Sequence, residues 1–130
     1  MPYEERVIEG EGYALIRGYG EVLVQQRIEV MQRLLQEPAF APGMPVLVDV
    51  REVEKALGFD GVEQIARAQA QMLAGHPVAY LTNPGTLYGV TRQVATLTEV
   101  AGGRQMQVFT DHGEAVSWIR ALSPNQRGRS

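Results

Sequence analysis

Short apolar runs rich in β-branched residues alternate with segments of helical periodicity along nearly the whole chain, and only a few residues connect one segment to the next. Strands that alternate with helices at such short connections form right-handed crossovers in a mainly parallel sheet. Residues 3–9 and 13–16 flank a turn-prone Gly-Glu-Gly segment, so they predict a hairpin whose first strand runs antiparallel. The expected architecture is therefore α/β with the order β-β-α-β-α-β-α-β-α.

The first helical segment starts after Glu21 and ends before Pro38. Its apolar residues recur at steps of three and four, which is typical of an amphipathic helix with one buried side. Polar and basic residues are assigned to the opposite, solvent-facing side. The expected buried residues are Val24, Ile28, Met31 and Leu35, and the expected solvent-facing residues are Arg27, Gln32, Arg33 and Gln36.

Capping residues predict where the later helices begin. Asp60 with Glu63 and Asp111 with Glu114 have the spacing of a capping box, in which the first side chain accepts a backbone hydrogen bond. Asn83 stands before a proline that suits the first position of a helix. We therefore expect Asp60, Asn83 and Asp111 to be the N-cap residues of the second, third and fourth helices.

Length, charge and composition exclude several classes of protein. A chain of 130 residues has room for one domain, which we place at residues 1–122, and the apolar-free residues 123–130 predict a flexible tail. A net charge of −3 gives no global positive field, so no nucleic-acid partner is expected. The acidic start is unlike a secretory signal, and no apolar run approaches membrane-spanning length, so we expect a cytoplasmic protein with no membrane insertion.

The sequence contains no pattern typical of a catalytic or metal centre. The absence of cysteine removes thiol nucleophiles and thiolate metal sites. The three serines, Ser117, Ser123 and Ser130, lie in the last helix or beyond it, without a nucleophile-elbow motif. His76 and His112 have no zinc-ligand spacing. We therefore predict no catalytic residue, no metal and no cofactor.

One group of polar residues marks a candidate binding site. Asp49 and Arg51 lie at the carboxyl end of the third strand and Asn83 follows the fourth, and ligands of open parallel sheets bind at that edge. Tyr88 and Arg92 are one turn apart on the following helix, so their side chains project together. The alternative interpretation is local: Asp49 and Arg51 pair with nearby backbone, and Tyr88 packs at an edge.

The order and spacing of several short segments resemble the bacterial SpoIIAA-like proteins, which are related in fold to STAS domains and to SEC14-like lipid-binding domains. The resemblance extends over residues 13–122, and the segments that carry it are 36–43 (QEPAFAPG), 46–51 (VLVDVR), 88–92 (YGVTR) and 108–111 (VFTD), with Glu114-Ala115 and Trp118-Ile119. It implies a βα superhelical fold with a four-stranded parallel core and an added antiparallel strand. It also implies a regulatory or ligand-binding role without catalysis.

The chain departs from this family at the start of the second helix. STAS antagonists carry a phosphorylatable Ser or Thr there, whereas Asp60 stands at the matching position of the segment GFDGV. A carboxylate is stabilised at a helix N-terminus by the helix dipole, which explains Asp60 without any further role. The other interpretation is a fixed mimic of the phosphorylated state. In either case the usual phosphoryl acceptor is absent from this position.

The leading hypothesis is thus a non-enzymatic regulatory or ligand-binding module whose partner is a protein or a small apolar ligand. For a lipid-like ligand, the SEC14-like resemblance implies a cavity beneath the helices, near Leu57, Phe59, Met72, Leu87 and Tyr88. An exposed apolar patch would instead favour a protein partner.

Two further hypotheses stay open. One is an enzyme that acts on a small anionic substrate, with Arg51 and Arg92 holding the charge and Asp49 as base. The other is a homodimer, which is compatible with any of these functions. The candidate ligand or partner site comprises Asp49, Arg51, Phe59, Asp60, Tyr88 and Arg92.

Overall fold

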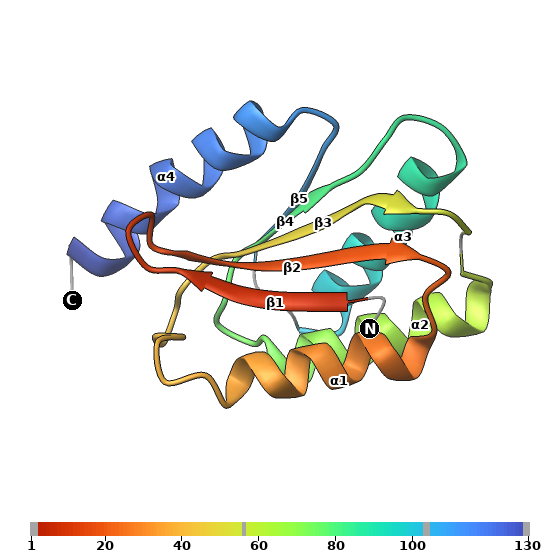
Figure 1. The fold of residues 1–130 in the computed structure, drawn as a ribbon, viewed down its shortest axis with the longest axis horizontal. Helices are drawn as coiled ribbons and strands as arrows, with labels where there is room; N and C mark the ends of the chain where they lie inside the picture. The colour runs from red at the N-terminus through yellow and green to blue at the C-terminus, as the bar shows by residue number, and fades with distance from the viewer. Residues whose placement is uncertain (1–2, 56, 103–104, 129–130) are drawn as a thin grey trace.

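The computed structural model describes residues 3–55, 57–102 and 105–128. The chain forms one five-stranded sheet in the order β1-β2-β3-β4-β5 with four helices (Figure 1). β1 is antiparallel to β2, and the other neighbouring strands are parallel, as the sequence predicts. The elements are β1 (Tyr3–Ile8), β2 (Tyr13–Gly20), α1 (Val24–Leu35), β3 (Val46–Val53), α2 (Phe59–Met72), β4 (Val78–Leu81), α3 (Thr86–Val100), β5 (Met106–Phe109) and α4 (His112–Gly128).

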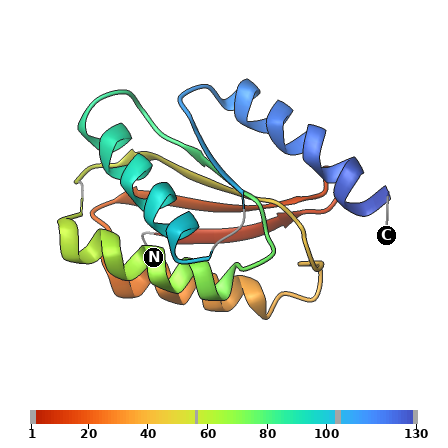
Figure 2. The ribbon, with the colours of Figure 1, turned by 180° about the vertical axis from the view of Figure 1, so that it is seen from behind.

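The helices divide unequally between the two faces of the sheet. The crossovers from β2 to β5 all pass on one side, so α1, α2 and α3 cover one face, while α4 lies across β3, β4 and β5 on the other (Figures 1 and 2). Alternate strand residues supply the two cores: Val46 and Val48 face α1 to α3, whereas Leu47 packs with Ile119 of α4. We call these the three-helix face and the α4 face.

The buried side of α1 differs from the one expected. Arg27, predicted to face solvent, is only 2% exposed, whereas Leu35, predicted to be buried, is 44% exposed. Val30, Met31 and Leu34 form the fully buried part of the helix. The prediction was wrong because the apolar residues of α1 span a broad arc, and the long aliphatic stem of an arginine can occupy an apolar side of a helix.

Two of the three predicted helix caps are also wrong. α2 begins at Phe59, and its N-cap residue is Gly58. Asp60 therefore lies within the first turn, where its carboxylate interacts favourably with the helix dipole but does not cap the helix. α3 begins after Gly85, and the Asn83 side chain donates instead to the Arg51 carbonyl oxygen, 2.7 Å away. The third prediction is confirmed, since Asp111 Oδ2 accepts the backbone N–H of Glu114 at 2.9 Å.

The last helix is longer than expected. α4 continues past Leu122 to Gly128, so the backbone of most of the predicted tail is helical. Extending an existing helix by one residue costs far less than starting one, which allows a helix to outlast its apolar stripe. Residues 129–130 lie outside the described part, and the flexibility of residues 123–130 stays a prediction. None of the described helices has the length and apolar character needed to span a membrane.

Candidate functional site

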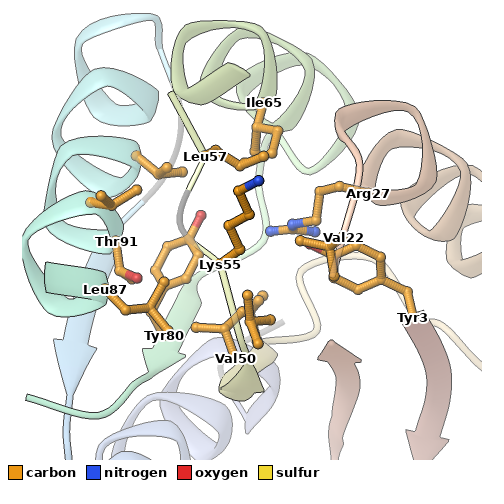
Figure 3. Close-up of a pocket in the computed structure, with 14 residues that line it drawn as sticks. Tyr3, Val22, Arg27, Val50, Lys55, Leu57, Ile65, Tyr80, Leu87 and Thr91 are labelled. Atoms are coloured by element: carbon orange, nitrogen blue, oxygen red, sulfur yellow. The ribbon is translucent and has the colours of Figure 1, made fainter. Parts of the chain in front are cut away.

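A pocket lies on the three-helix face, between the carboxyl ends of β3 and β4 and the helices above them (Figure 3). Its walls are mostly apolar, and the cavity has a volume of about 50 Å³ and opens to solvent at its mouth. An apolar lining with a few polar groups is typical of sites for small molecules. The walls include Val48, Val50, Ile65, Leu87, Val90 and Val94.

Three buried polar side chains from α1, α2 and β4 form one hydrogen-bonded chain at the inner wall. Arg27 Nη2 donates to Gln69 Oε1 at 2.5 Å, and Gln69 Nε2 donates to the Tyr80 hydroxyl oxygen. The Arg27 guanidinium also lies 5.9 Å from the centre of the Tyr3 ring, within the range of a cation–π contact. Arg27, Gln69 and Tyr80 are each at most 3% exposed, so this polar chain lies inside an apolar core.

Arg27 is not fully satisfied by these contacts. Its Nη1 is buried and has no hydrogen-bond partner, and no carboxylate of the described residues forms an ion pair with it. Figure 3 shows the guanidinium pointing into the pocket. A buried charge without a counter-charge loses its hydration and gains little in return, so this arrangement is costly for the empty protein.

Two other polar residues that line the pocket, Tyr80 and Lys55, differ in exposure. Burial raises the pKa of Tyr80, and the nearby Arg27 charge lowers it in part, so the phenol stays protonated at neutral pH. Its hydroxyl already accepts a hydrogen bond from Gln69, which leaves its own proton to be donated. Lys55 lies at the mouth, where its amine is 3.5 Å from Glu21 and largely exposed. The pocket thus combines an apolar wall with positive charge and hydrogen-bond donors.

The predicted residues Asp49 and Arg51 lie together, but on the α4 face and outside this pocket. Arg51 Nε and Nη2 donate to the two carboxylate oxygens of Asp49 at 3.0 and 2.9 Å. Burial alone would raise the pKa of Asp49, but the hydrogen bonds from Arg51 outweigh it, and the pKa is lowered. The contact between Asn83 and the Arg51 carbonyl shows that the loops after β3 and β4 are neighbours, as expected.

The other predicted residues lie along α3 and the start of α2. Tyr88 and Arg92 line a shallow polar groove between α3 and β5, which confirms that their side chains project to one place. Phe59 lines a second groove against α3, again beside Arg92, and is 62% exposed. Asp60 is exposed in the first turn of α2 and lines neither groove. None of these four residues lines the apolar pocket.

Sequence reasoning found the wall of the pocket in part and missed its polar centre. Of the five residues expected near a cavity, Leu57 and Leu87 line it, whereas Phe59, Met72 and Tyr88 do not. Arg27 was misassigned to solvent, although the spacing of residues 24, 27, 31 and 34 is that of a continuous helical stripe and was a usable signal. Within the described residues, no group of three His, Asp or Glu side chains could hold a metal ion.

Comparison with known proteins identifies the fold. No known family model and no curated protein matches the chain. Among solved structures, it is similar to an uncharacterized protein of the DUF3478 family with a SpoIIAA-like fold from Shewanella loihica PV-4, with a TM-score of 0.60 and 15% identity over 90% of this chain and 91% of that one. The chain therefore has a SpoIIAA-like fold, which confirms at the level of fold the resemblance drawn from the sequence.

Proposed function

We propose that this chain is a non-enzymatic module that binds a small, mostly apolar ligand in the pocket of the three-helix face. The observation that carries the proposal is the pocket itself, a partly enclosed and mainly apolar space at the carboxyl ends of parallel strands. A ligand that removes the remaining apolar surface of half-buried side chains from water lowers the free energy of the complex.

The candidate acid–base residues support binding better than catalysis. A general base must be free to take a proton from a bound substrate, and its pKa should lie near the working pH. Both carboxylate oxygens of Asp49 accept hydrogen bonds from Arg51, and its pKa is lowered rather than raised. The enzyme hypothesis, with Asp49 as base, therefore has little support from this geometry.

The first test is native mass spectrometry of the chain purified gently from its own host. We expect a non-covalent mass of small-molecule size that disappears on denaturation, and the same spectrum reads the oligomeric state. The second test is titration of the chain with 1-octanol, followed by backbone NMR. Saturable shifts at Ile65, Leu87 and Val94, which line the pocket, are expected.

A matched pair of substitutions on α3 makes the titration specific. Val90 lines the pocket, whereas Val100 is 79% exposed on the same helix. Val90→Phe fills the space and should abolish saturable octanol binding, and Val100→Phe should leave it unchanged. Equal binding by both variants, or no saturable binding by the wild type, would contradict the proposal.

A second candidate function, docking of a partner protein, is favoured by the exposure of Phe59. A phenylalanine that is 62% exposed beside a groove is an unusual feature of a monomer surface and suits an interface. The two functions separate cleanly, since Phe59→Ala should weaken capture of a protein partner and leave octanol binding unchanged.

A further inference from the structure

We infer that the ligand of this pocket carries a carboxylate, and that Arg27 is the residue that recognises it: the site takes a small carboxylic acid with an apolar body. This inference rests on the proposed function, because it assigns the chemical class of the ligand bound in the same pocket. The observation behind it is the unpartnered Nη1 of Arg27, a donor on a side chain that is only 2% exposed.

The partner that Arg27 lacks is an anion, because none of the described residues supplies a carboxylate to it. The guanidinium, which Figure 3 shows directed toward the pocket, lies near neutral groups, namely the Gln69 amide, the Tyr80 hydroxyl and the Tyr3 ring, and its Nη1 has no hydrogen-bond partner. A charge in such surroundings is stabilised strongly by an opposite charge and only weakly by neutral acceptors. Arg51 provides the contrast within the same molecule, since its guanidinium is already bound by both oxygens of Asp49.

The geometry suits a carboxylate with an apolar tail. Arg27 and Tyr80 both line the pocket, so one carboxylate can accept from Nη1 and from the Tyr80 hydroxyl, whose proton is free to be donated. The tail then runs along the valine and leucine wall toward the mouth, where the exposed Lys55 amine adds positive charge to the path of entry. A ligand with charge along its whole length does not fit this wall, because most of the lining side chains are apolar.

The inference predicts an order of affinities among ligands of equal length. Octanoate, 1-octanol and octylammonium share one tail and differ in the head group, and hydrogen bonds to charged groups contribute more than neutral ones. In the wild-type chain, octanoate should bind about tenfold or more tightly than octanol by isothermal titration calorimetry, and octylammonium should bind most weakly. Arg27→Met should remove the preference of octanoate over octanol, while Arg51→Met should retain it.

A measurement on the wild-type protein keeps the test decisive if Arg27→Met does not fold. The ¹³C carboxyl signal of labelled octanoate reports its ionisation, and a carboxylate on Arg27 should stay ionised to lower pH than free octanoate. A bound acid with the ordinary pKa would contradict the role of Arg27.

The outcomes distinguish this inference from the proposed function beneath it. If octanol binds as tightly as octanoate, or if Arg27→Met keeps the preference for the acid, then Nη1 is satisfied by a buried water and the inference is wrong, while the apolar ligand site stands. If no compound of the series binds, both proposals fail. A preference for the acid that disappears in Arg27→Met supports both.

Discussion

The two faces of the sheet each carry an arginine, but only one of the two has a carboxylate partner among the described residues. On the α4 face, the charge of Arg51 is neutralised by Asp49, two residues away on the same strand, and the helix above packs on a closed apolar core. On the three-helix face, Arg27 is buried more deeply but has no carboxylate partner among the described residues, and the core around it opens into a pocket. The comparison teaches that an arginine with its own carboxylate needs no further partner, whereas the unpaired Arg27 is the feature on which the proposed ligand site depends.

The largest expected effect tests whether one face is closed and the other open. Ile119 is fully buried against the sheet on the α4 face, whereas Leu87 is half-buried in the wall of the pocket. Ile119→Ala should lower the free energy of unfolding by about 3 kcal/mol, because it leaves a closed cavity. Leu87→Ala should cost about 1 kcal/mol, since its surface is partly hydrated already. Chemical denaturation measures both, and equal costs would show that the pocket is packed as tightly as the α4 core.

A second effect tests how much Arg27 depends on Gln69. Gln69→Leu removes the acceptor of Arg27 Nη2 and should lower the free energy of unfolding by about 2 kcal/mol, because a second guanidinium nitrogen then loses its partner. In the Arg27→Met background the same change should cost clearly less, since no charge is left unsatisfied. Gln32→Leu, at an exposed position of α1, is the control and should change stability by no more than about 0.5 kcal/mol.

If Gln69→Leu cost the same in both backgrounds, then Arg27 and Gln69 would contribute independently to the free energy of unfolding. Arg27 would then be stabilised by something other than the polar chain, and the contrast between the two faces would lose its basis. A strong coupling between the two substitutions would instead show that the hydrogen bond from Arg27 to Gln69 holds the guanidinium in place.

The sequence predicts the fold better than it predicts the site, for a physical reason. The antiparallel β1 and the order of helices and strands along the described residues follow from hydrophobic periodicity and short connections, which are local properties of the chain, whereas the order of strands within the sheet was not predicted. The polar centre joins Arg27, Gln69 and Tyr80, which are far apart in the sequence and meet only after three elements pack. Gln69 shares the helical spacing of Val62, Ile65 and Ala66, which indicates a buried side of the helix, but this spacing does not show which residue is its partner.

The wrong helix caps have a similar origin. Asp60 and Asp111 are followed by glutamate at the same spacing, yet only Asp111 precedes its helix, because α2 begins one residue before Asp60. Asn83 was assigned as a cap from the proline that follows it, but its side chain finds the Arg51 carbonyl across the sheet edge. Capping signals are local, and a tertiary acceptor or a shift of the helix start by two residues overrides them.

The third prediction uses pH to examine the three-helix face alone. Burial raises the pKa of Tyr80, although Arg27 lowers it in part, so the folded chain keeps this phenol protonated when the unfolded chain has begun to ionise. The contribution of Tyr80 is complete below its ordinary pKa of 10.0 and is lost as the pH rises through the folded value. The free energy of unfolding of the wild type should therefore fall more steeply above pH 10 than that of Tyr80→Phe.

Denaturation curves from pH 8 to pH 11 measure this difference. Tyr13 is present in both proteins, whereas the charge of ionised Tyr3 raises the pKa of Tyr80 and so adds to the steeper fall of the wild type. Parallel curves for the wild type and Tyr80→Phe would mean that the Tyr80 hydroxyl reaches water, and the polar chain would then not be enclosed.

The smallest effect concerns the ion pair on the α4 face. Because the Arg51 side chain is 39% exposed, solvent screens the pair, and Arg51→Gln should lower the free energy of unfolding by only about 0.5 kcal/mol at neutral pH. Burial would raise the pKa of Asp49, but the Arg51 hydrogen bonds lower it overall, so the pair contributes above the ordinary pKa of 3.8 and its contribution is lost as the pH falls through the folded value. The difference between wild type and Arg51→Gln should thus shrink below pH 3.8. If it instead persisted in acid, Arg51 would stabilise the fold through packing rather than charge, and it would no longer serve as the charge-paired counterpart of Arg27.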